Sequence, residues 1–101
     1  MAQTHIVVGV ALDESALTLE ELARACAVEP EWVRERVDTG ILGGPAAPSQ
    51  RRFSGADLAR ARRLRDVERT FDADENLAAL VVDLSEEVRR LRARLRAAGL
   101  V

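Results

Sequence analysis

The chain has 101 residues, of which 48% are hydrophobic and 32% are charged, and its formal net charge is −2. This length predicts one small domain spanning residues 1–101, and the composition indicates a globular, soluble protein rather than a disordered one. The single cysteine excludes an intrachain disulfide and fits a reducing compartment, so we expect a cytoplasmic protein. The apolar run at residues 6–12 is too short to span a membrane, and no membrane contact is expected.

Charge is distributed unevenly along the chain. Residues 1–50 hold three arginines and eight acidic residues, a net charge of −5. Residues 51–101 hold twelve arginines and nine acidic residues, a net charge of +3. All basic residues are arginines. An acidic half-chain disfavours a partner that is itself a polyanion and favours a basic partner.

The N-terminal part predicts a strand and then a helix. Residues 4–12 are rich in β-branched side chains and predict a short strand, with a loop to residue 14. Thr18 and Glu21 have the spacing of a capping box, which predicts that a helix begins there. The apolar positions of this helix share one face; they are Leu19, Leu22, Ala23, Cys26 and Ala27. Cys26 is expected to be a core thiol.

A second helix is predicted directly after a tight turn. Pro30 suits its first position, and Gly40 supplies a left-handed stop after about Thr39. Trp32, Val33 and Val37 are predicted to point inward. Two short helices joined by a tight turn form a helix-turn-helix, and the loop from Ile41 to Phe53 could form a wing beside it, so residues 18–53 make one unit.

Two further helices are predicted in the C-terminal half. Ser54 and Asp57 start a third helix spanning residues 54–71, and Asp74 lies in a third start signal. The third helix is predicted to bury Leu58, Ala61, Leu64, Val67 and Phe71. The last helix spans residues 72–98 and ends at Gly99; at 1.5 Å per residue it is roughly 37 Å long.

Apolar residues recur along the last helix at alternating steps of four and three. This heptad pattern predicts a helix that buries one narrow seam in a coiled coil. A small chain cannot cover a seam of this length by itself, so we expect a homodimer, although the seam could instead fold back on the third helix. The predicted dimer interface consists of Leu77, Val81, Leu84, Val88, Leu91 and Leu95, with Ala98 at the end of the series.

Nothing in the sequence predicts an enzyme. His5 is the single histidine and Cys26 the single cysteine, they fall in different elements, and a zinc site needs about four such ligands. The motifs of phosphate-binding loops, dinucleotide-binding folds and nucleophile elbows are missing. We therefore expect no catalytic residues, no bound metal and no cofactor.

The predicted order of elements leaves two binding functions open. A helix-turn-helix, a wing and a coiled-coil helix suit a DNA-binding regulator, which would use Arg34, Arg36, Arg51 and Arg52. DNA binding draws much of its affinity from neutralised phosphates, however, and a half-chain at −5 opposes it. We therefore expect specific DNA binding to be absent or weak. The alternative is an acidic dock for a basic helix. Its residues, inferred from charge, are Glu20, Glu21, Glu31, Glu35 and Asp38.

Several segments resemble known families. The segment at residues 19–23, Leu-Glu-Glu-Leu-Ala, and the segment at residues 33–42, which ends Asp-Thr-Gly-Ile-Leu, resemble transcription regulators of the MerR type. The patterns at residues 62–66, 76–84 and 86–95 look like the chaperone-modulator proteins of the CbpM type, a MerR-like branch with a different partner. This resemblance covers about residues 15 to 97.

The resemblance implies both a fold and a function. The fold is mostly α: a MerR-like winged helix-turn-helix, a long C-terminal coiled-coil helix and a short N-terminal strand. The function is that of a non-enzymatic adaptor that binds the J-domain of a CbpA/DnaJ-like co-chaperone and modulates it, most simply by inhibition. The alternative is a MerR-like DNA-binding transcription regulator. The family tends to have a Leu-Gly turn between the third and fourth helices, whereas this position reads Arg69-Thr70-Phe71-Asp72 here.

The orientation of the dimer has two competing indications. β-Branched residues at one seam position, with leucine at the other, favour a parallel pair. The resemblance to MerR proteins implies an antiparallel pair, and we follow it. Glu87 can meet an arginine of the partner, Arg92 or Arg94, in either orientation.

Overall fold

The computed structural model describes residues 17–43 and 51–100, which form four α-helices. They are α2 (Leu19–Cys26), α3 (Pro30–Asp38), α4 (Gly55–Phe71) and α5 (Glu75–Ala97). The prediction of a mostly α-helical protein is therefore confirmed. The predicted strand at residues 4–12 lies outside the described residues, as does the central part of the predicted wing.

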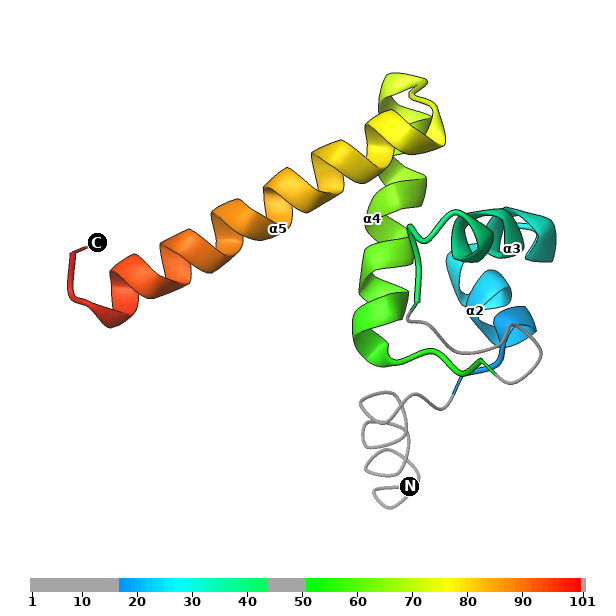
Figure 1. Ribbon diagram of the computed structural model, residues 1–101, viewed down its shortest axis with the longest axis horizontal. Coiled ribbons are helices and arrows are strands. Elements are labelled where there is room, and N and C mark those ends of the chain that lie inside the picture. Colours follow the sequence, from blue (N-terminus) through cyan, green and yellow to red (C-terminus); the bar gives the residue numbers. More distant parts are fainter. Residues whose placement is uncertain (1–16, 44–50, 101) are drawn as a thin grey trace, which may run out of the picture.

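Helices α2, α3 and α4 pack into a small head, and α5 extends away from it (Figure 1). A short antiparallel backbone pair joins the start of α2 to the start of α4, with Leu17 N donating to Phe53 O at 3.0 Å and Phe53 N donating to Leu17 O at 2.8 Å. Phe53 is fully buried and belongs to the core of the head.

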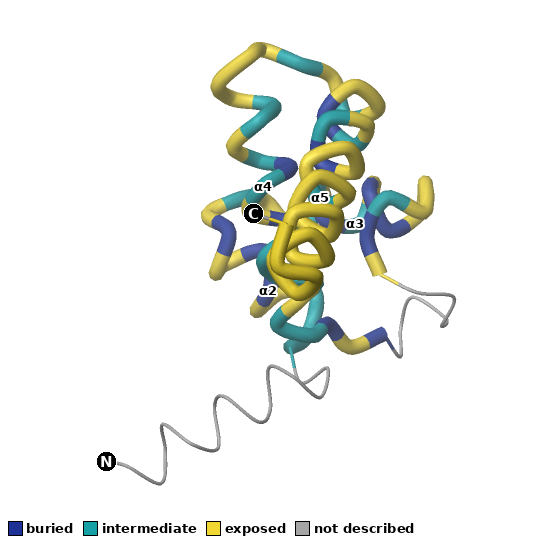
Figure 2. Tube along the Cα trace, turned by 90° about the vertical axis from the view of Figure 1, so that its left-hand side faces the viewer, coloured by how far each residue is buried: buried dark blue, intermediate teal, exposed yellow. Residues whose placement is uncertain are grey.

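The core lies where α2, α3 and α4 meet the first turns of α5. Two α5 residues, Ala78 and Val82, enter it, and beyond Val82 every residue from 83 to 100 is exposed except the half-buried Glu86. Figure 2 shows the burial confined to the head and to the adjoining start of α5. The buried core residues are Leu22, Ala23, Cys26, Val33, Val37, Leu42, Phe53, Ala61, Leu64, Ala78 and Val82.

Each helix starts with a side-chain or proline signal. Thr18 and Ser54 both form complete capping boxes, with Glu21 and Asp57 as the reciprocal partners. Asp74 accepts a hydrogen bond from Leu77 N at 2.8 Å, and Pro30 opens α3. These starts agree with the sequence prediction because each depends on residues at most three positions apart.

All four described helices end in the same way. A left-handed residue follows the helix, and the next amide bonds back to a carbonyl five positions earlier, as Leu100 N does to Leu95 O at 2.9 Å. Gly40 and Gly99 are the left-handed residues of α3 and α5, as predicted. In α2 and α4 the same position is held by Ala27 and Asp72, with φ of 56° and 49°.

Two burial predictions are wrong. Phe71 is 70% exposed, because it lies in the last turn of α4, beyond the part of that helix that faces the core. Ala27 is exposed, because the left-handed turn at this residue carries it off the apolar face of α2. The alternative in which the seam packs against the third helix is also not observed. The α5 residues buried in the core beside α4 are Ala78 and Val82, which lie on a neighbouring face of α5.

Candidate partner-binding surfaces

Four exposed carboxylates lie on the solvent side of α2 and α3, and we call them the acidic face: Glu20, Glu31, Glu35 and Asp38. Three of them, Glu20, Glu31 and Asp38, act on Arg34, whereas Glu35 lies 3.9 Å from Arg36. The side chain of Glu31 binds Arg34 directly and raises the pKa of its guanidinium, and Glu20 and Asp38 raise it further through space. Glu20 of α2 therefore lies in the same electrostatic environment as Glu31 and Asp38 of α3.

Glu21 has a different role from the rest of the predicted docking set. Its carboxylate accepts a hydrogen bond from Thr18 N at 2.8 Å and closes the capping box of α2. The bonds to the Thr18 backbone and side chain lower the pKa of Glu21, and its charge also lies near Arg24 and Arg52. It is exposed, so a partner can still reach it, but its first role is to start the helix.

Arg36 is buried, so the structure removes it from the set of surface arginines. Its Nε donates to Glu68 Oε2 at 3.0 Å and its Nη2 donates to Glu68 Oε1 at 2.9 Å. The guanidinium also lies 4.0 Å from the centroid of the Trp32 ring and donates to Trp32 O. The indole N–H of Trp32 bonds to the same Glu68 carboxylate at 3.0 Å. These contacts fasten α3 to α4.

Arg51 is also buried, whereas Arg52 is exposed. The side chain of Arg51 packs against Gly43, where an added Cβ would lie 2.7 Å from Arg51 Nη1. Arg52 remains at the surface and donates to Arg51 O at 3.2 Å. Of the four arginines considered for DNA contact, Arg36 and Arg51 are thus internal, Arg34 lies among carboxylates, and Arg52 faces solvent. The burial of Arg36 depends on Glu68, 32 positions further along the chain, and no local sequence pattern indicates such a partner.

Three arginines of α4 point at the end of α2 and were not singled out from the sequence. Arg65 donates to Cys26 O at 2.6 Å, Arg69 to Ala27 O at 3.1 Å and Arg62 to Ala25 O at 3.5 Å. Carbonyls at the end of a helix lack partners within the helix and attract cations. The three arginines are three and four positions apart, which places them on one face of α4, and this spacing was the sequence signal that could have identified them.

Within residues 17–43 the exposed side chains carry more negative than positive charge. Across residues 17–43 there are six carboxylates and three guanidiniums, and one of the three, Arg36, is buried. Because Arg36 is buried, only two guanidiniums of this segment, those of Arg24 and Arg34, remain to offset the six carboxylates.

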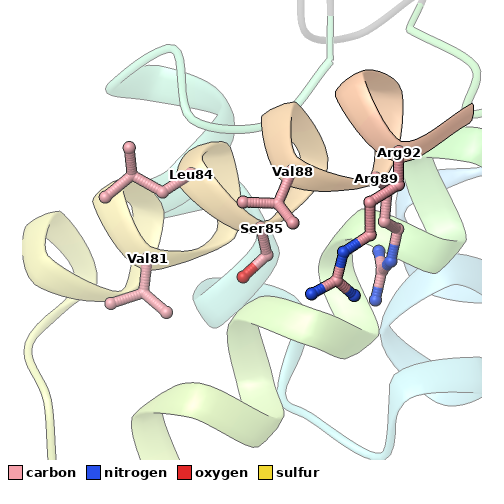
Figure 3. Close-up of a pocket in the computed structure, with 6 residues that line it drawn as sticks. All are labelled: Val81, Leu84, Ser85, Val88, Arg89 and Arg92. Atoms are coloured by element: carbon pink, nitrogen blue, oxygen red, sulfur yellow. The ribbon is translucent and has the colours of Figure 1, made fainter. Parts of the chain in front are cut away.

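The predicted dimer residues form an exposed apolar strip on α5. Leu84 is 58% exposed, and Leu77, Val88, Leu91 and Leu95 are each more than 40% exposed. Figure 3 shows Val81, Leu84 and Val88 in succession along the helix, with Arg89 and Arg92 beyond them, lining an open apolar depression. A second depression continues along Leu91, Arg94, Leu95 and Ala98.

The described residues contain no cluster of three or more histidine, cysteine or acidic side chains arranged to hold a metal ion. Within residues 17–43 and 51–100, none of the helices is apolar over enough of its length to cross a bilayer.

Comparison of the chain with protein-family models, with curated proteins and with solved structures finds no match.

Proposed function

We propose that this protein is a non-enzymatic adaptor that binds the J-domain of a CbpA/DnaJ-like co-chaperone through its acidic face and modulates its activity as a homodimer. The observation that carries the proposal is the concentration of exposed carboxylates on α2 and α3, together with the burial of Arg36. J-domains engage their Hsp70 partner through a basic helix, in keeping with the family resemblance. A carboxylate surface would compete for that helix.

The charge argument gives the interaction a kinetic signature. Exposed charges that complement each other across an interface mainly accelerate association, and salt screens them over about 8 Å at physiological ionic strength. We therefore expect binding to a J-domain to weaken with added salt, chiefly through the association rate.

The test is a binding measurement between the full chain and a purified J-domain. The double variant Glu31→Lys with Glu35→Lys should lose most of the affinity. For a matched control, Glu35→Lys is compared with Asp66→Lys, because the two side chains are 69% and 64% exposed and the charge change is the same. Asp66 lies on α4 and is not one of the carboxylates that act on Arg34, so its reversal should leave binding nearly unchanged.

Equal loss in the two single variants would mean that net charge alone is responsible. If neither reversal nor salt alters the affinity, the contact must be apolar or lie elsewhere, and the proposal fails.

The alternative, a MerR-like DNA-binding transcription regulator, is favoured by the packing of α2 against α3 across the turn at residues 27–29. It predicts a specific complex with DNA. Such a complex surviving at physiological salt, with a Kd of roughly 10⁻⁸ M or tighter, would replace the adaptor proposal.

A further inference from the structure

The side of α5 that enters the core continues beyond the head as a row of arginines. Ala78 and Val82 are buried in the head, and further steps of three and four residues from Val82 stay on the same side of the helix. The positions reached are exposed; they are Ser85, Arg89, Arg92 and Arg96, and we call the three arginines the arginine row. Figure 3 shows the Ser85 hydroxyl and two of these guanidiniums on one side of α5. The arginine row lies beside the seam and is not part of it.

No carboxylate neutralises the arginine row. Residues 88–97 contain no acidic residue. Glu86, which precedes the arginine row, is held by two arginines of α4, with Arg60 at 3.1 Å and Arg63 at 3.6 Å. Within the part of the chain that the structure describes, the arginine row takes part in no ion pair or side-chain hydrogen bond. Its three guanidiniums are therefore available to a partner.

The opposite flank of the seam has a different charge pattern. Steps of four and three place Asp83, Glu87, Arg90 and Arg94 there, two residues of each sign. Glu87 binds Arg90 directly and raises the pKa of its guanidinium. Asp83 contacts Arg60 at 2.9 Å. The flank with the arginine row is thus the purely cationic one, and it favours an anionic partner.

The spacing of the arginine row matches that of carboxylates on another helix. At 1.5 Å per residue, Arg92 lies about 4.5 Å beyond Arg89, and Arg96 about 6 Å further. Carboxylates at steps of three and four on a second helix have the same separations and share one face. Guanidiniums form strong hydrogen bonds with carboxylates, and the Ser85 hydroxyl adds a further donor beside them. An acidic helix lying along α5 can therefore pair with all three arginines.

A nucleic acid fits this molecule less well. The arginine row is about 11 Å long and offers three contacts. Duplex DNA carries one charge per roughly 1.7 Å and extends far beyond such a row. The chain as a whole has a net charge of −2, which opposes a long polyanion. A short acidic helix meets only α5 and avoids this repulsion.

We propose that the arginine row is a docking surface for an acidic helix of a partner protein, one with carboxylates at steps of three and four along one face. The proposal goes beyond J-domain binding, because a basic helix would bind the acidic face of the head and not the arginine row. It also holds whether or not a second copy covers the seam. The chain then has two docking surfaces of opposite charge, one on the head and one on α5.

An NMR titration of the full chain with a synthetic helical peptide tests the proposal. The peptide carries three glutamates at steps of three and four, and a second peptide of the same composition has them spread around the helix. At an ionic strength of about 0.01 M, screening is weak. The first peptide should then shift the side-chain Nε–Hε signals of Arg89, Arg92 and Arg96 and leave those of Arg90 and Arg94 nearly unchanged. The second peptide should bind several-fold more weakly, and added salt should weaken both.

Two double variants with the same change of charge provide the matched comparison. Arg89→Gln with Arg92→Gln should raise the Kd of the first peptide about fivefold, because two exposed ion pairs are lost. Arg90→Gln with Arg94→Gln, on the opposite flank, should change it less than about twofold. Glutamine has nearly the helix propensity of arginine, so both variants should keep α5 helical, which circular dichroism checks.

Other outcomes overturn the proposal. Equal losses in the two double variants mean that net charge alone attracts the peptide, and equal binding of the two peptides means that the spacing is irrelevant. Failure of the first peptide to bind removes the acidic helix as the partner. Shifts of the arginine-row signals with protein concentration, in the absence of peptide, mean that a second copy occupies the row. Tighter binding of a DNA duplex than of the first peptide, lost in Arg89→Gln with Arg92→Gln, assigns the row to a nucleic acid.

Discussion

Arg36 on α3 and Glu68 on α4 form a two-contact ion pair in the interior of the head, with side chains 9% and 15% exposed. Trp32 contributes both a ring beneath the guanidinium and an indole N–H to the carboxylate. The position of α3, and hence of the acidic face, depends on this group of three side chains.

Replacing Glu68 by Gln should lower the free energy of unfolding by about 3 kcal/mol, because it leaves the buried Arg36 without its compensating charge. Urea unfolding of the full chain measures the change. Glu35→Gln is the control: Glu35 also lies near Arg36, at 3.9 Å, but is mostly exposed, so its loss should cost less than about 0.5 kcal/mol. Similar losses in the two variants would contradict the importance assigned to the buried pair.

Ala27→Gly should stabilise the protein by about 1 kcal/mol. Ala27 has a φ of 56°, which a residue with a Cβ adopts at a cost and glycine adopts freely. Ala25, two positions earlier and also exposed, lies within α2, so Ala25→Gly should destabilise by a similar amount. Thermal unfolding of both variants gives the comparison, and the same sign for both changes would be evidence against a left-handed end to α2.

Acid should weaken the start of α2. Hydrogen bonds from Thr18 lower the pKa of Glu21 below its ordinary value of 4.5, so the folded chain binds this proton less tightly than the unfolded chain. The stabilisation is therefore complete above about pH 4.5 and is lost as the pH falls through the lower folded value. A carboxyl titration by NMR should give a low pKa for Glu21, which Thr18→Ala should raise. A Glu21 titration unchanged by Thr18→Ala would contradict the capping box.

Cys26 should react slowly with thiol reagents in the folded protein. The side chain is fully buried, and burial raises the pKa of its thiol, so little reactive thiolate is available. Labelling then requires opening of the head. Glu68→Gln should accelerate labelling about a hundredfold if the loss of stability predicted above is correct. Fast labelling of the wild-type protein at neutral pH would show that the thiol is accessible without unfolding.

The local elements of this fold were predictable because their signals are local. Thr18, Ser54 and Asp74 each bind an amide three residues away, and Gly40 and Gly99 supply their own left-handed conformation. The ends at Ala27 and Asp72 were not predicted as such, because an alanine or aspartate gives no comparable signal. Phe71 was assigned to the core because it continues the apolar spacing of Leu64 and Val67 along α4, but the last turn of α4 extends beyond the core.

The surface was less predictable than the helices. Glu20, Glu31, Glu35 and Asp38 are exposed, as their place in the predicted docking surface requires, but several arginines depend on partners far along the chain. Arg36 meets Glu68, 32 positions away, and Arg65 meets the carbonyl of Cys26, 39 positions away. The spacing of Arg62, Arg65 and Arg69 shows that they share a face of α4, but it does not identify what that face contacts, so a count of charges could not separate structural arginines from exposed ones.

Because Val82 is the last residue of α5 in the core, α5 consists of two segments, one packed on the head and one extending beyond it, and these segments differ in their protection from solvent. Amide hydrogens near Ala78 and Val82 are shielded by the head and should exchange with deuterium only when the head opens. Those from Leu84 to Ala97 depend on the helix itself and on whatever covers its seam. Their exchange rate should therefore change with protein concentration, while that of the head stays constant.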